Sequence, residues 1–164
     1  LKRALSFFKE KFYLKDKDIV LLVFGANKPQ NNENLPFDIN YLGQISDDIT
    51  LNIIYNSADV FIAPSREDNL PNTIVEALSC GVPCVAFNVG GMIDLIEHKN
   101  NGYLAEPFNI EDLAEGINFV LEDENRWNNL SENALNKAQK DYNINDISDK
   151  YIDLYKKILG CDDK

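Results

Sequence analysis

Several residue types and segment types are scarce in this 164-residue chain, and each scarcity excludes a class of protein. No apolar run approaches the ~20 residues that span a bilayer. The N-terminus lacks the basic, apolar and small-residue pattern of a secretory signal. The three cysteines, Cys80, Cys84 and Cys161, are too few and odd in number for a disulfide framework, which suits a reducing compartment. We therefore expect a cytoplasmic protein.

Cysteine and histidine, the side chains that most often bind zinc, are equally scarce. Cys80 and Cys84 are separated by a segment that contains Gly81 and Pro83, and the one histidine, His98, is distant in sequence. A zinc site needs about four ligands. No Asp-x-Asp motif is present either, since Asp47 and Asp48 are adjacent. We expect no metal, and Cys80 and Cys84 to be small buried side chains.

Basic residues are outnumbered, with 16 Lys+Arg against 27 Asp+Glu and a net charge of -11. Nonspecific nucleic-acid binding requires cations that contact phosphates, so DNA and RNA are poor candidate partners. An anionic membrane surface is an equally poor candidate partner on the same ground. An anionic ligand requires a local dipole or a few cations that overcome the overall field.

Apolar residues make up 45% of the chain, and their spacing alternates between helical and strand patterns. Expected strands are short, nearly all apolar runs, as in parallel sheets covered on both faces. We therefore predict an α/β fold, a Rossmann-like doubly wound parallel sheet, in which ligands bind beyond the carboxyl ends of the strands. Expected strands are 18–24, 39–43, 59–64, 82–87 and 103–104; expected helices are 1–13, 50–57, 72–80, 92–97, 109–121, 124–140 and 145–159, with a polar loop over 27–34. Asn109 is the expected cap of its helix, with Asp112 at the capping-box position.

Residues 70–93 carry a single charge, Glu76. An unpaired buried carboxylate costs several kcal/mol, so this acid requires partners. Asn72 and Thr73 precede Glu76 by four and three residues and therefore share its helix face. A polar stripe is thus expected near a helix N-terminus, at the end of a strand.

The segment Ser65-Arg66-Glu67-Asp68-Asn69 follows the third strand, where a ligand-binding loop is expected. Backbone N–H groups of Asn72, Thr73 and Ile74 and the helix dipole would favour a diphosphate there, while carboxylates would accept from hydroxyls. This combination fits a sugar nucleotide. Alternatively, Asn69 or Asn72 is merely an N-cap, Glu76 is a structural acid bound to a loop amide, and Gly90-Gly91 is an ordinary turn.

The run S-A-D-V-F-I-A-P-S-R-E-D-N-L-P-N-T-I-V-E-A-L-S-C-G-V-P-C-V-A-F-N-V-G-G-M-I-D-L-I, starting at Ser57, resembles the signature of a glycosyltransferase family. The family is glycosyltransferase family 4, the glycosyl transferases group 1, and the similar part is the C-terminal nucleotide-sugar-binding domain of its GT-B fold. The resemblance covers nearly the whole chain. It implies a retaining enzyme that transfers a sugar from a nucleoside diphosphate sugar to an acceptor, with no cofactor, in surface polysaccharide or glycolipid synthesis.

The resemblance also assigns roles to residues. Glu76 takes the place of the acid that accepts from the ribose hydroxyls. Asp68 takes the place of the usual glutamate that contacts the donor sugar, with Glu67 adjacent as the alternative. The segment from Leu70 to Thr73, with Asn72, takes the place of the one whose amides meet the diphosphate, and Gly43 lies at the base. Asn69 is a further implied donor-binding residue.

By the same resemblance, an Arg and Lys pair, the first strand and an acceptor-binding domain are expected upstream of Leu1. We therefore expect residues 1–164 to be one donor-binding domain of a longer two-domain enzyme, with residues 141–164 as its closing helix. Lys28 and Arg66 are cations near the expected site, but neither matches the basic pair. The acceptor would be a glycan or lipid, and the absent domain could attach the enzyme peripherally to the cytoplasmic membrane.

Three rival functions remain open at the level of sequence. A nucleotide-sugar binding module without turnover would carry the same motif. A phosphorylase or epimerase on the same fold would need a lysine-bound cofactor or further acids in the cleft, and no lysine matches. A receiver-like signalling domain would need acids after the first strand, where Gly25-Ala26-Asn27 has none.

Overall fold

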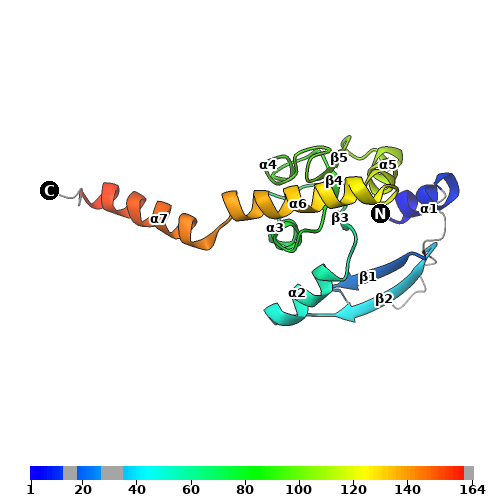
Figure 1. The fold of residues 1–164 in the computed structure, drawn as a ribbon, viewed down its shortest axis with the longest axis horizontal. Coiled ribbons are helices and arrows are strands. Elements are labelled where there is room, and N and C mark those ends of the chain that lie inside the picture. The colour runs from blue at the N-terminus through cyan, green and yellow to red at the C-terminus, as the bar shows by residue number, and fades with distance from the viewer. Residues whose placement is uncertain (13–17, 27–34, 161–164) are drawn as a thin grey trace.

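The computed structural model describes residues 1–12, 18–26 and 35–160. The expected polar loop 27–34, with Lys28, and Cys161 lie outside these residues. The helices and strands follow one another in the predicted order, and every pairing between the strands is parallel. The elements run α1 (Lys2–Lys11), β1 (Val20–Phe24), β2 (Asp38–Gly43), α2 (Asp48–Asn56), β3 (Phe61–Ala63), α3 (Asn72–Ser79), β4 (Cys84–Phe87), α4 (Met92–Leu95), β5 (Gly102–Ala105), α5 (Ile110–Leu121), α6 (Glu124–Asp141) and α7 (Ile144–Leu159) (Figure 1).

The central layer is the three-stranded sheet β3-β4-β5. Alternate side chains of β4 point to opposite faces, as strand geometry requires. Cys84 and Ala86 join one buried cluster with α3 and α6, whereas Val85 and Phe87 join a second cluster with α1 and α5. Helices therefore cover both faces of this sheet, which is the Rossmann-like arrangement expected from the sequence.

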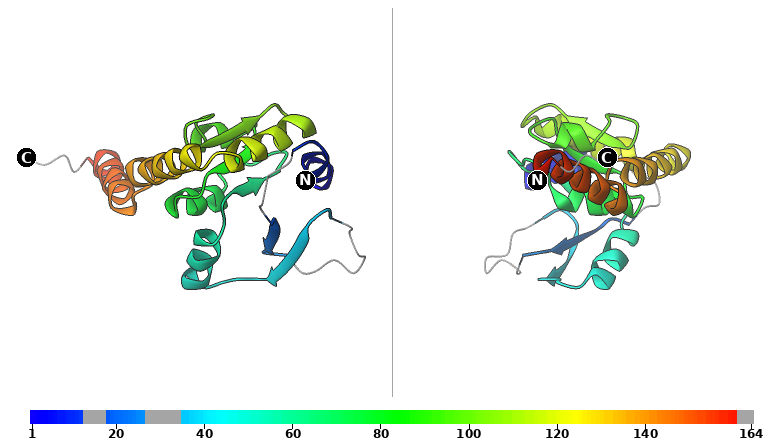
Figure 2. Two further views of the ribbon diagram at one scale, coloured as in Figure 1. Left: turned by 45° about the vertical axis from the view of Figure 1, so that its right-hand side comes forward. Right: turned by 90° about the vertical axis from the view of Figure 1, so that its left-hand side faces the viewer.

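The expectation of one continuous sheet is wrong, because β1 and β2 form a separate two-stranded sheet. In the views of Figure 1 and Figure 2, this pair and α2 lie to one side of the β3-β4-β5 layer. A cavity of about 660 Å³ separates the two sheets, lined by all of β1, by Phe61 and Ile62 of β3, and by α1. The expectation that the first strand is buried on both faces is also wrong, since Val20 is 50% exposed.

The C-terminal helices differ in their packing. Helix α6 packs against α3 and α5 and buries Leu130, Ala134 and Ala138. Helix α7 forms where predicted but buries no residue, and it extends away from the rest of the chain (Figure 1). Within the described part of segment 141–164, Tyr142 packs against the core, whereas α7 does not cover the domain.

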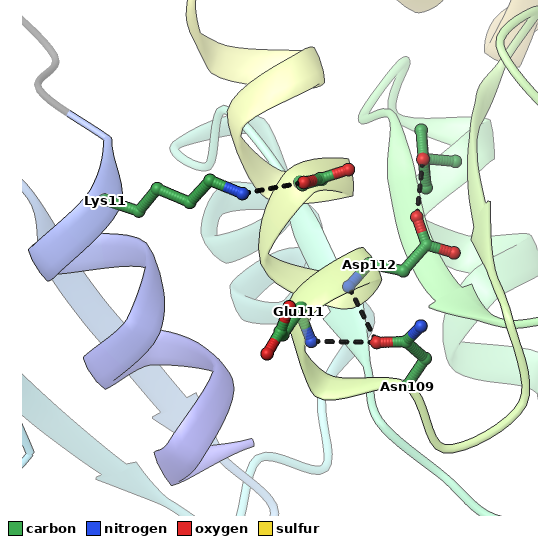
Figure 3. Close-up of polar contacts among 6 residues, drawn as sticks. Lys11, Asn109, Glu111 and Asp112 are labelled. Atoms are coloured by element: carbon green, nitrogen blue, oxygen red, sulfur yellow. Dashed lines mark hydrogen bonds and ion pairs between the residues drawn. The ribbon is translucent and has the colours of Figure 1, made fainter.

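Helix α5 is fixed at its N-terminus by a side-chain cap. Asn109 Oδ1 accepts from the N–H groups of Glu111 and Asp112, both at 3.1 Å (Figure 3). The expected reciprocal bond from Asp112 is not formed. Its carboxylate accepts instead from the Tyr103 hydroxyl at 2.7 Å and from the Glu106 N–H at 2.6 Å, which anchors α5 to β5 and the following loop.

Candidate donor-binding site

The candidate site is the connection from β3 to α3, beyond the carboxyl end of β3. The hydrogen bond between Tyr103 of β5 and Asp112 of α5 lies outside this connection. Residues 64–71 leave β3, and α3 then begins at Asn72. Pro71 is the N-cap residue, and no side chain caps this helix end. The alternative that Asn69 or Asn72 is simply an N-cap is therefore wrong.

The first turn of α3 retains free backbone donors. No described group accepts from the N–H of Asn72 or Thr73, and both residues are exposed. The expectation that Ile74 is a third donor is wrong, because its N–H bonds to the Pro71 carbonyl at 3.0 Å in a tight first turn. Two amides with the helix dipole behind them are available to an anion.

Glu76 is exposed on α3, and its described hydrogen bond joins it to another helix. The hydroxyl of Tyr55, on α2, donates to Glu76 Oε2 at 2.8 Å. The alternative that a loop amide binds Glu76 is therefore wrong for the described residues, in which the donor is a tyrosine hydroxyl. Burial and the bond to Glu76 both raise the pKa of Tyr55, so its hydroxyl remains a donor at physiological pH.

The loop that contains Glu67, Asp68 and Asn69 rests on the Gly90-Gly91 turn. The Gly91 N–H donates to the Asp68 carbonyl at 2.8 Å. A Cβ atom at Gly90 would lie 2.3 Å from the Asp68 carbonyl oxygen, and one at Gly91 would lie 1.6 Å from that of Asn69. The interpretation of Gly90-Gly91 as an ordinary turn missed this close packing, which only glycine permits.

The acidic residues of this loop differ in exposure: Asp68 is half-buried, whereas Glu67 is exposed, like Asn69 and Leu70. Arg66 lies over the Phe108 ring, 5.6 Å from its centroid. Gly43, the predicted base-pocket residue, lies at the end of β2 and accepts from the Gly25 N–H at 2.8 Å. No described contact joins Gly43 to the loop, so its role stays a prediction.

Of the two described cysteines, Cys80 is the C-cap residue of α3 and Cys84 begins β4, and neither forms a disulfide. Cys84 is fully buried, as predicted, and Cys80 is half-buried. Burial raises the pKa of both thiols, which favours packing over nucleophilic chemistry.

Among the described residues, no group of three or more His, Cys, Asp or Glu could hold a metal ion, and no helix is long and apolar enough to cross a membrane.

These features define a Rossmann-like α/β domain with a polar site at the carboxyl end of a strand. The chain belongs to the glycosyl transferases group 1 family, whose sequence pattern matches residues 1–137. This confirms the resemblance of the signature that starts at Ser57.

Similar proteins extend this assignment. The chain is 32% identical over 158 residues to the N,N'-diacetylbacillosaminyl-diphospho-undecaprenol alpha-1,3-N-acetylgalactosaminyltransferase of Campylobacter jejuni, covering 94% of this chain and 41% of the relative. A glycosyltransferase structure from Rickettsia africae matches with a TM-score of 0.76 at 25% identity, covering 95% of this chain and 44% of that one. The Anabaena HepE structure with UDP and glucose matches with a TM-score of 0.69 at 27% identity, covering 75% and 33%. The chain thus spans less than half the length of these proteins.

Proposed function

We propose that this domain binds a nucleoside diphosphate sugar and serves as the donor-binding half of a retaining glycosyltransferase. The observation that carries the proposal is the uncapped N-terminus of α3 with exposed Glu76 one turn further along the same helix. This geometry offers N–H donors for a diphosphate and a carboxylate acceptor for hydroxyls within a single element.

Each group would act on a different part of the donor. The N–H groups of Asn72 and Thr73 would donate to diphosphate oxygens, where negative charge accumulates as the bond to the sugar breaks. Glu76 would accept from ribose hydroxyls, while Asp68 or Glu67 would contact the sugar. Stabilisation of the leaving diphosphate and positioning of the donor would be the domain's contribution to rate.

The relatives support the donor class. HepE is described with UDP and glucose, and the Campylobacter relative is named for transfer of N-acetylgalactosamine to a lipid-linked diphosphate. For this chain we propose an acceptor that is a glycan or a lipid, in surface polysaccharide or glycolipid synthesis. Because the chain spans 41% of the Campylobacter relative, we propose that the acceptor site lies in residues beyond these 164. We also propose that the protein is cytoplasmic and that the reaction needs no cofactor.

The test is calorimetric titration of the chain with UDP, comparing the unaltered protein with Glu76→Ala. Losing a charged hydrogen-bond partner is worth ~1.5–3 kcal/mol, so we expect roughly 10- to 100-fold weaker binding. Glu132→Ala is the matched control, because Glu132 is an exposed glutamate of α6 for which no hydrogen bond is described. Unchanged affinity in a folded Glu76→Ala variant would remove the ribose role of Glu76.

A further inference from the structure

Tyr55 links the proposed ribose acid to the interior of the protein. Its side chain is 2% exposed, although its hydroxyl reaches the exposed carboxylate of Glu76. The ring packs edge-on against Phe24 of β1 and Phe61 of β3, with centroids at 5.5 and 5.7 Å. Tyr55 is thus held by both sheets, and its hydroxyl occupies a fixed point beside α3.

The Glu76 carboxylate has little else to fix it. It is exposed on a helix surface, where a glutamate side chain has several accessible rotamers, and ordering such a chain costs conformational entropy. The Tyr55 bond occupies Oε2. Within the described ranges no group donates to Oε1, so this oxygen is available to a ligand.

We propose that Tyr55 is a positioning residue that orients the Glu76 carboxylate so that Oε1 accepts from the ribose of the donor. This inference rests on the proposed function and adds to it a residue outside the signature loop. Tyr55 touches no substrate in this scheme. Its effect is preorganisation. The Glu76 side chain loses its conformational entropy when the protein folds, so this cost no longer opposes binding of the ligand.

A merely structural role for the same bond is the rival explanation, since the hydroxyl also ties α2 to α3. The two roles differ in ligand dependence. A structural tie would affect all nucleotides alike, whereas a positioning role requires the ribose hydroxyls. The informative quantity is therefore the ratio of affinities for UDP and for 2′,3′-dideoxy-UDP.

The test measures both affinities in Tyr55→Phe, which keeps the ring and its contacts and removes the hydroxyl. One net hydrogen bond corresponds to roughly two- to tenfold in affinity. We expect UDP binding to weaken by about that factor, 2′,3′-dideoxy-UDP binding to stay unchanged, and the ratio to fall accordingly. The same substitution in a Glu76→Ala background should change neither affinity.

Tyr103→Phe is the matched control. Tyr103 is 9% exposed and its hydroxyl donates to the Asp112 carboxylate at 2.7 Å, so this variant loses the same kind of bond away from the site. Its affinity ratio should equal that of the unaltered chain. An unchanged ratio in folded Tyr55→Phe, or an equal fall in Tyr103→Phe, overturns the inference.

The outcomes separate the two proposals. If Glu76→Ala weakens UDP binding and Tyr55→Phe leaves the ratio intact, only the positioning role fails. If Glu76→Ala has no effect, the ribose role of Glu76 fails and the inference with it. If the unaltered chain shows no UDP binding at millimolar concentration, the proposed function itself fails. If Tyr55→Phe does not fold, NMR of the unaltered chain with ring-labelled tyrosine takes its place. We expect the Tyr55 resonance to shift with UDP and not with 2′,3′-dideoxy-UDP. If UDP causes no shift of this resonance, the inference is overturned.

Discussion

Asp68 and Glu67 are adjacent carboxylates that differ in how firmly the structure holds them. The Asp68 carbonyl accepts from the Gly91 N–H, and the residue is half-buried, whereas Glu67 is exposed. A fixed backbone positions its side chain better than a free one does. We therefore propose that Asp68, rather than Glu67, contacts the sugar.

The assignment predicts a difference between two ligands. Asp68→Asn should weaken binding of UDP-glucose or UDP-N-acetylgalactosamine by roughly 10-fold, consistent with one charged hydrogen bond, and leave binding of UDP unchanged. Titration of the chain with each compound measures this difference. If Glu67→Gln shows the loss instead, Glu67 makes the sugar contact; an equal loss for UDP in Asp68→Asn would contradict the sugar role altogether.

At the residue scale the sequence indicated a candidate site but not the contacts that hold its side chains. Glu76 could be singled out because it is the one charge in residues 70–93. Its partner Tyr55 is 21 residues away, and only the packing of α2 beside α3 brings the two together. The Ile74 amide was wrongly predicted as a ligand donor because whether the first turn closes on Pro71 depends on local backbone geometry.

At the scale of elements, the Gly90-Gly91 turn between β4 and α4 sets the position of the candidate site. It packs against the Asp68 and Asn69 carbonyls more closely than any side chain would permit. The loop after β3 and the turn after β4 are thus complementary surfaces at one edge of the sheet. A change in the turn is therefore transmitted to the loop.

Gly91→Ala should destabilise the chain by about 1–3 kcal/mol, the usual cost of overpacking, and should also weaken UDP binding. The reason is steric, since the Gly91 φ of -74° is open to alanine while its Cβ would meet the Asn69 carbonyl. Urea denaturation and UDP titration measure the two effects. Gly160→Ala is the control, because Gly160 ends α7 in open space and its substitution should leave UDP affinity unchanged.

Helix and strand order was predictable because the apolar periodicities are strong, and the helix 109–121 was even capped at the expected residue. The split of the sheet was not predicted. In the doubly wound strand order 3-2-1-4-5-6, strands 2 and 4 are joined only through strand 1. If β1 and β3 are the second and fourth strands, the cavity between them marks the place of the first, which explains why Val20 is exposed.

On the scale of the whole molecule, this gap weakens the support of the candidate site. The edges of β1 and β3 that face the cavity are unpaired, and unpaired strand edges are local weak points. Tyr55 bridges the two sheets through Phe24 and Phe61, so the site depends on both. We therefore expect weak donor binding by the chain alone.

The last prediction is that the chain alone transfers no sugar. Arg66 is the single cation among residues 64–71, and it lies over Phe108, in a protein of net charge -11. The developing charge on the diphosphate would thus meet two helix amides and little else. By the proposed function, an opposing domain would exclude water and hold the acceptor, and these 164 residues tested alone would act without it. Losing charge stabilisation and orientation together could remove roughly 10 kcal/mol of barrier lowering, about seven orders of magnitude in rate.

A radiolabelled-donor assay tests this prediction, using UDP-N-acetylgalactosamine or UDP-glucose with a lipid-linked or glycan acceptor. With the chain alone, the label should leave the donor no faster than it does by hydrolysis in buffer, although the chain binds UDP. A longer protein, in which these 164 residues are extended to the full length of the relatives, should transfer the labelled sugar to the acceptor. Glu76→Ala in that protein should lower the rate of transfer. Transfer by the 164 residues alone would show that one domain suffices, and donor binding without transfer by the longer protein would favour a binding module over an enzyme.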